Sequence, residues 1–185
     1  MVRRPSIPPE RRVALIATGG TIEKTYDPLE GMLANRVSVL DVMLGSLELR
    51  GVAVDRVPLM NKDSLEMTEA DHERIAREVR VRAADHAGVI VVHGTDRLAR
   101  TGDRIFADGP PPVPVVLTGA MRPYELRSTD ALQNLTEALL AVQLLSPGVY
   151  CVMHNQVLAF PGVEKDPRRG TFRQRLPEPG APSSP

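Results

Sequence analysis

Short apolar runs alternate along the chain with segments of helical spacing. In the apolar runs at 13–17, 88–92 and 115–118 nearly every position is Val, Ile, Leu or Ala, which is typical of strands buried on both faces of a sheet. Between them, apolar side chains recur three and four positions apart, and this spacing predicts amphipathic helices. Strands are expected at 13–17, 52–60, 88–92, 115–118 and 149–153, and helices at 37–50, 68–84, 98–106 and 128–145.

Strands separated by helices predict an α/β fold of three layers with a largely parallel, doubly wound sheet, Rossmann-like or flavodoxin-like, in a single domain. We expect this domain to span residues 13–175. Residues 1–12 and 176–185 are rich in proline and poor in apolar side chains, so a disordered N-terminal arm and tail are expected there. Ligands of such folds bind beyond the carboxyl ends of the strands, and the loops at these ends are therefore the candidates for chemistry.

Composition narrows the classes of partner. The formal net charge is zero, aromatic residues make up 3% of the chain and Trp is absent, so nothing favours nucleic acid or an anionic membrane. The single cysteine, Cys151, excludes an internal disulfide and is expected in the core. Since the sequence shows neither a membrane span of ~20 apolar residues nor a secretory signal, we expect a cytoplasmic protein.

The first expected strand ends in the loop Thr18-Gly19-Gly20-Thr21. Its glycines allow a tight turn and a close approach of backbone to a ligand. Its hydroxyl groups are weak nucleophiles that need a base or a polarising partner. An ordinary strand-to-loop turn is the alternative. A phosphate loop is disfavoured, because the Lys-Ser/Thr pair and the glycine fingerprint of nucleotide binders are missing.

Two further polar loops follow the second and third expected strands. Residues 62–67 offer a hydroxyl, two carboxylates and an ammonium group, and the alternative is a solvated loop. After the third strand, Asp96 either holds an ammonium group or takes part in proton transfer, or simply caps the next helix. His93 and His154 have no partners at metal-ligand spacing, so no metal is expected.

Together these loops resemble the bacterial-type L-asparaginase family (asparaginase/glutaminase). The likeness runs from about Val13 to Phe172 and corresponds to a short, single-domain form equivalent to the N-terminal domain of longer enzymes. It rests on five segments in order: Thr18-Gly19-Gly20-Thr21-Ile22, Asp63-Ser64-Leu65-Glu66-Met67, His93-Gly94-Thr95-Asp96, Gly119-Ala120-Met121-Arg122-Pro123 and Ser128-Thr129-Asp130-Ala131-Leu132-Gln133-Asn134-Leu135.

The resemblance implies hydrolysis of L-asparagine to L-aspartate and ammonia through a threonine nucleophile, without a cofactor. It also implies a homodimer or larger homo-oligomer around a small amino-acid substrate. By this likeness the catalytic residues are Thr21 as nucleophile, Thr95 as second threonine, Asp96, and Tyr26 on a mobile lid. The residues expected to bind substrate are Ser64 and Asp63, Asp96 at the α-ammonium group, and Gly20 and Gly94, whose surroundings supply backbone N–H groups for an oxyanion hole.

The resemblance also implies a lysine in a relay with Thr95 and Asp96, and Val113 occupies the position aligned with it. We therefore expect another cation to act there, with Lys62 ranked before Lys24 and Arg122. Two alternatives to an asparaginase remain open. One is an amidohydrolase of another small amide, and the other is an asparaginase-like amino-acid-binding protein with little or no catalysis.

Overall fold

A six-stranded sheet forms the centre of the molecule. The computed structural model describes residues 10–27, 31–34 and 38–175. The sheet has the strand order β4-β1-β5-β6-β7-β8, in which the first five strands are parallel and β8 runs antiparallel to β7. The strands span Arg11–Gly19 (β1), Val52–Lys62 (β4), Gly88–Val92 (β5), Pro114–Thr118 (β6), Gly148–Met153 (β7) and Gln156–Ala159 (β8).

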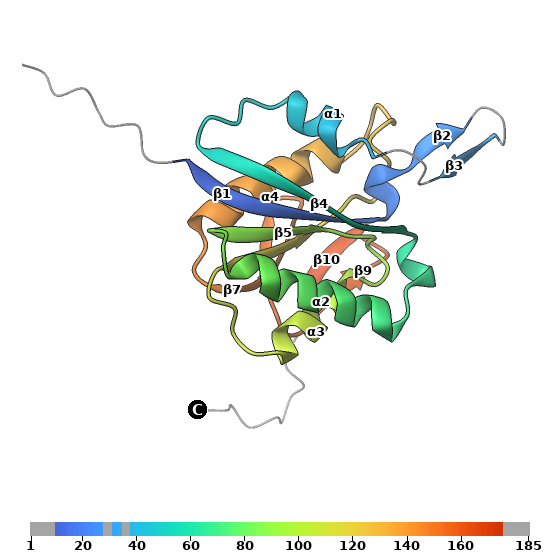
Figure 1. Ribbon diagram of the computed structural model, residues 1–185. Helices are drawn as coiled ribbons and strands as arrows, with labels where there is room; N and C mark the ends of the chain where they lie inside the picture. The colour runs from blue at the N-terminus through green and yellow to red at the C-terminus, as the bar shows by residue number, and fades with distance from the viewer. Residues whose placement is uncertain (1–9, 28–30, 35–37, 176–185) are drawn as a thin grey trace, which may run out of the picture.

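Helices cover both faces of this sheet, which confirms the three-layer, largely parallel α/β fold (Figure 1). One face carries α1 and α4, and the other carries α2 and α3. The helices span Leu40–Gly45 (α1), Glu69–Ala83 (α2), Leu98–Ala107 (α3) and Ala131–Leu144 (α4). Among the described residues, no helix is both long and apolar enough to cross a membrane.

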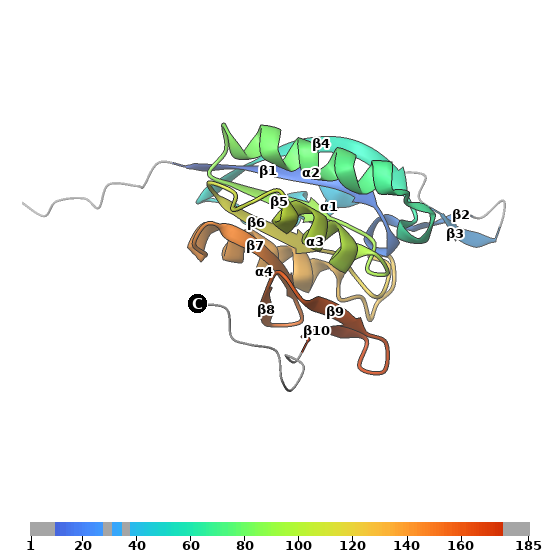
Figure 2. The same ribbon diagram turned by 90° about the horizontal axis from the view of Figure 1, so that it is seen from below.

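Two small hairpins lie outside the periodic pattern of the sequence. One pairs β2 (Thr25–Asp27) with β3 (Met32–Ala34), and the other pairs β9 (Val163–Asp166) with β10 (Thr171–Gln174). Both project at the end of the sheet where the parallel strands terminate (Figure 2). Strands of three or four residues are too short to show a reliable alternation, which is why the sequence did not predict them.

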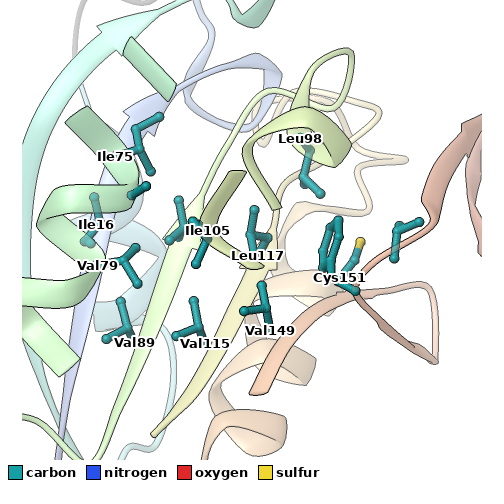
Figure 3. Packing of buried hydrophobic residues seen from close by; sticks show 14 of the residues in the cluster. Ile16, Ile75, Val79, Val89, Leu98, Ile105, Val115, Leu117, Val149 and Cys151 are labelled. Carbon is teal, nitrogen blue, oxygen red and sulfur yellow. The ribbon is translucent and has the colours of Figure 1, made fainter. Parts of the chain in front are cut away.

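Apolar side chains of the strands pack against the helices on each face. On one face, Val89, Val115 and Val149 lie in a row across three neighbouring strands, and they pack with Ile16 against α2 and α3 (Figure 3). Cys151 is buried in the same cluster, as predicted, and burial raises the pKa of its thiol. This thiol is therefore protonated and unreactive at neutral pH.

The expected elements are present, with changes at their ends. β1 begins at Arg11, so Arg11 and Arg12 belong to the sheet, whereas residues 1–9 and 176–185 lie outside the described part. The first helix is much shorter than the expected 37–50, since Ser46 already folds back and donates its hydroxyl to the carbonyl oxygen of Met43. Helix α4 begins at Ala131, later than the expected 128–129, because Asp130 binds the preceding loop and does not cap the helix.

The N-terminus of α2 is stabilised by a capping box and an ion pair. Thr68 and Asp71 exchange side-chain-to-backbone hydrogen bonds, as the sequence predicted for Thr68. Lys62 Nζ lies 2.9 Å from both carboxylate oxygens of Asp71. The hydrogen bond from the Thr68 N–H and the Lys62 contact lower the pKa of Asp71 to about 2.

The substitution Gly102→Ala tests the contact between α3 and the segment after β8. A Cβ atom at Gly102 would overlap the ring of Phe160. We expect a loss of ~1–3 kcal/mol in the free energy of unfolding, larger than the ~1 kcal/mol by which alanine favours a helix. Gly45→Ala is the matched control, because a Cβ there meets nothing within 4 Å. If urea unfolding gave Gly102→Ala the same free energy of unfolding as Gly45→Ala, this packing would be contradicted.

The substitution Asp71→Asn tests the electrostatic contribution at α2. A lowered folded-state pKa means that this contribution is complete above the unfolded value of ~3.9 and is lost as the pH falls to about 2. Asp71→Asn should therefore lower the melting temperature at pH 7, and the difference from wild type should vanish near pH 2. Glu66→Gln, at an exposed position of the preceding loop, is the control. Equal melting temperatures of Asp71→Asn and wild type at pH 7 would refute the assignment.

Candidate active site

The strand order reverses between β1 and β5. From β1 the chain moves to β4 on one side, and it then returns past β1 to β5 on the other. In open α/β sheets a ligand crevice forms outside the carboxyl ends of the strands at such a switch point. The loops after β1, β4 and β5 are the three polar loops singled out in the sequence, and they surround this position.

Glycines bring these three loops into backbone contact. Gly20 has φ 87°, and a Cβ atom there would lie 2.5 Å from Cα of Gly94. A Cβ atom at Gly94 would in turn lie 2.6 Å from Ser64 Oγ. No larger residue fits either position without displacing a loop. Thr21 follows Gly20 and Thr95 follows Gly94, so the two threonines lie on either side of the contact between these glycines. Ser64 lies beside the same contact.

The two threonines of the first loop have different environments. Thr18 is buried and donates its hydroxyl to the carbonyl oxygen of Val92 at 2.9 Å, which ties the end of β1 to that of β5. Thr21 is half-buried and opens the 3₁₀ turn Thr21–Glu23. The hydroxyl available for chemistry in this loop is thus that of Thr21.

Ser64 and Asp63 also differ in what they contact. Ser64 is 1% exposed, and its Oγ has no hydrogen-bond partner among the described residues. A buried hydroxyl without a partner costs free energy, so this oxygen is suited to a ligand. Asp63 instead accepts hydrogen bonds from Lys24 Nζ at 2.8 Å and from the N–H of Leu65, which lower its pKa. Its carboxylate links two loops.

Lys165 of β9 reaches the pair formed by Thr95 and Asp96. Its Nζ donates to Thr95 Oγ1 at 2.8 Å and to Asp96 Oδ1 at 2.8 Å. Thr95 is buried and Asp96 is exposed, so the ammonium group lies at the boundary between the core and the crevice. Sequence reasoning missed Lys165, because it lies in a short hairpin without periodicity.

The expectation that Lys62 would serve this pair is wrong. Lys62 binds Asp71, Lys24 binds Asp63, and Arg122 Nε lies 3.9 Å from Asp130 Oδ1. Val113 precedes β6 at the amino end of that strand and packs against the core, at the opposite end of the sheet from the crevice. The alignment that placed the lysine at Val113 therefore put it at the wrong end of a strand.

A partly buried hydrogen-bond network supports the hairpin that carries Lys165. Phe172 pairs with Lys165 across the hairpin and is 1% exposed. Next to it, Thr171 Oγ1 lies 2.8 Å from His154 Nδ1, and His154 Nε2 lies 2.8 Å from Asp130 Oδ2. The hairpin is thereby tied to the start of α4.

Asp130 is the centre of this network. Burial opposes its charge, but hydrogen bonds from the N–H of Met121, from His154 and from the N–H of Arg122 outweigh burial and lower the pKa of Asp130. Asn134 adds a hydrogen bond from Nδ2 at 2.9 Å. The two motifs that follow β6 thus form a support for the site, and Gly119 lies against its third loop, since a Cβ atom there would lie 3.6 Å from Thr95 Cγ2.

Tyr26 lies on β2 and is 57% exposed. Its backbone N–H donates to Glu125 Oε2 at 2.6 Å, which connects the β2–β3 hairpin to the loop after β6. Within the described residues, no hydrogen bond joins Tyr26 to Thr21. Its expected action on Thr21 therefore requires that the hairpin close over the crevice.

The three loops and the β9–β10 hairpin thus bring together hydroxyl groups, an ammonium group and an exposed carboxylate. Thr21 and Thr95 carry hydroxyl groups, Lys165 donates a hydrogen bond to that of Thr95, and the hydroxyl of Ser64 is unpaired. This set suits acyl transfer, which needs a nucleophile, a proton carrier and donors for an oxyanion.

Comparison with known proteins agrees with this chemistry. Residues 12–169 match the family model described as Asparaginase, N-terminal. An L-asparaginase of Thermococcus kodakarensis is 29% identical over 155 residues, which cover 83% of this chain and 47% of that protein. A glutamyl-tRNA(Gln) amidotransferase subunit of Aeropyrum pernix is 33% identical over 162 residues, which cover 84% of this chain and 38% of that protein.

Solved structures show the same fold. The thermostable L-asparaginase from T. kodakarensis superposes with a TM-score of 0.79 at 28% identity, covering 88% of this chain and 51% of that one. A probable cytoplasmic L-asparaginase from Campylobacter jejuni has a TM-score of 0.68 at 28% identity, covering 84% and 48%. The chain spans about half the length of these relatives, or less. It belongs to the asparaginase family and covers the region of that family's N-terminal domain.

Proposed function

We propose that this protein hydrolyses the side-chain amide of L-asparagine to L-aspartate and ammonia, with Thr21 as the nucleophile. The observation that carries the proposal is the contact of Lys165 Nζ with Thr95 Oγ1 and Asp96 Oδ1, next to the loop of Thr21. It supplies the cation that the Thr95–Asp96 pair lacked in the sequence. No cofactor takes part in the proposed reaction.

The direction of this hydrogen bond suggests how protons move. Because Lys165 donates to Thr95 Oγ1, the hydroxyl hydrogen of Thr95 is free to point at a substrate. In the first half-reaction, Thr21 Oγ1 bonds to the amide carbon and the carbon–nitrogen bond breaks. The Thr21 proton leaves with the nitrogen as ammonia, carried by the Thr95 hydroxyl. Water then cleaves the ester and restores Thr21.

The same crevice offers groups for the head of an amino acid. Lys165 donates a hydrogen bond to Oδ1 of Asp96, and we propose that Oδ2 binds the α-ammonium group of the substrate. The unpaired hydroxyl of Ser64 is assigned to the α-carboxylate. Two fixed contacts at the head would orient the amide carbon toward Thr21, which lowers the entropic part of the barrier.

A second candidate is the release of ammonia from another amide. Relatives named as subunits of glutamyl-tRNA(Gln) amidotransferases match this chain as well as the L-asparaginases do. In that case the chain would act beside a partner protein. The third reading, a binding protein without catalysis, rested in part on the lysine that Val113 replaces in the alignment, and the position of Lys165 weighs against it.

Assembly and location remain predictions. From the likeness to the asparaginase family, we propose that the protein assembles as a homodimer or larger homo-oligomer. The proposed substrate is a small amino acid, which is consistent with the expected cytoplasmic location.

Ammonia release from L-asparagine and L-glutamine tests the proposal. Thr21→Ala, Thr95→Val and Lys165→Met should each lower kcat/KM for the preferred amide by about 10²–10⁴-fold, the range typical of lost general acid–base or nucleophilic groups. Thr18→Val is the matched control for the first loop, since its hydroxyl only ties two strands. Wild-type turnover by Thr21→Ala would overturn the assignment of the nucleophile.

Val113→Lys separates the two placements of the lysine. We expect no gain in ammonia release, because position 113 lies at the end of the sheet opposite the crevice and Lys165 already contacts Thr95. Lys62→Met should likewise keep most of the activity, since Lys62 pairs with Asp71. If Val113→Lys raised kcat or Lys62→Met abolished it, the role given to Lys165 would be incorrect.

A further inference from the structure

Two histidines and a threonine form a buried chain beneath the loop after β5. His72 Nδ1 lies 2.7 Å from Thr101 Oγ1, and Thr101 Oγ1 lies 2.8 Å from His93 Nε2. The chain ends where His93 Nδ1 lies 2.8 Å from the carbonyl oxygen of Gly94. All three side chains are fully buried, and the rings of His72 and His93 are stacked with centroids 6.3 Å apart.

The chemistry of the last acceptor sets the direction of the whole chain. A carbonyl oxygen only accepts, so His93 Nδ1 must carry the proton. Burial lowers the pKa of His93 to about 4, so its Nε2 is unprotonated at neutral pH and accepts the Thr101 hydroxyl. The Thr101 oxygen must then accept from His72 Nδ1–H.

His72, at the other end of this series of hydrogen bonds, agrees with the same direction. Burial lowers the pKa of His72 as well, so its ring is neutral with the single proton on Nδ1. His72 Nε2 is then a lone pair, and it is buried with no hydrogen-bond partner among the described residues. An unsatisfied buried nitrogen costs free energy, and groups in this state call for an explanation beyond stability.

The fixed carbonyl of Gly94 determines where its peptide group points. In a trans peptide, the C=O of Gly94 and the N–H of Thr95 point in opposite directions. With the carbonyl held on His93 in the interior, the Thr95 N–H points away from the buried histidine. Gly94 contacts Gly20 and Ser64 on its other side, and these residues border the crevice.

We propose that His72, Thr101 and His93 are positioning residues that aim the Thr95 N–H at the oxyanion of the tetrahedral intermediate. This role rests on the proposed amidohydrolase function. A preorganised donor stabilises the transition state because no reorientation is needed when charge develops. None of the three side chains touches the substrate in this scheme, and their effect passes through one peptide group.

NMR of the wild-type protein tests the hydrogen bonds of His72, Thr101 and His93 without any activity measurement. Nitrogen NMR shifts distinguish the two neutral tautomers of histidine, and both His72 and His93 should carry the proton on Nδ1 at pH 7. The proton on Nε2 of His93 would overturn the proposal, because the bond to Gly94 would then be missing. This result would leave the proposed hydrolysis of asparagine untouched.

Thr101→Val and Thr101→Ser form a matched pair. Valine has the shape of threonine but no hydroxyl, whereas serine keeps the hydroxyl. With Thr101→Val we expect kcat for ammonia release to fall about 10-fold or more, toward the 10²–10³-fold typical of a lost oxyanion donor, with KM within about threefold of wild type. Thr101→Ser should restore kcat. Equal kcat for valine and wild type would refute the proposal.

The Thr95 amide signal separates the failure of this proposal from that of the proposed function. Its backbone nitrogen and proton shifts should change in Thr101→Val and remain near wild type in Thr101→Ser. If wild type releases no ammonia from either amide, the proposed function fails, and an unchanged Thr95 signal in Thr101→Val would separately exclude the positioning role. If Thr101 had a purely structural role, Thr101→Val and Thr101→Ser would lower the melting temperature equally, and both would keep the kcat of wild type.

Discussion

The contact of backbone against backbone at Gly20, Gly94 and Ser64 is the constraint on which the candidate site depends. Parallel strands deliver their loops to one edge of the sheet, but ordinary side chains would keep the loops apart. Glycine at two positions removes the Cβ atoms that would collide. The residues that follow, Thr21 and Thr95, are thereby placed on either side of one contact, and three hydroxyl-bearing loops meet at the switch point between β1 and β5.

A second layer of interactions holds the charged part of the site. Lys165 comes from a hairpin outside the main sheet, and its position depends on Phe172 in the core and on the chain from Thr171 through His154 to Asp130. Asp130 in turn binds the loop after β6. The regular geometry of a parallel sheet positions the threonines, whereas a partly buried polar network positions the lysine. Such networks are effective only when most members are paired, as they are around Asp130.

The groups of the candidate site differ in their exposure to solvent. The hydroxyl of Thr95 and the chain of His93, Thr101 and His72 lie in the interior, where hydrogen bonds are strong and orientation is fixed. Asp96 and Tyr26 lie on the exposed side. Fixed, buried groups beneath exposed ones suit the proposed enzyme, which would bind a small polar molecule and then exclude solvent.

The sequence by itself determined the layers of the fold and the polar loops of the site, because buried strands and amphipathic helices have regular spacing and because Thr-Gly-Gly-Thr and His-Gly-Thr-Asp are local signals. It did not determine the short hairpins, the length of α1 or the cation beside Thr95. The family's lysine was aligned with Val113, and Lys62 was expected to act in its place. Lys165 lies 69 residues from Asp96 in the chain, in a segment without periodicity. Only the tertiary structure brings them together, since packing of Phe172 and hydrogen bonds to His154 carry no signal in the local pattern.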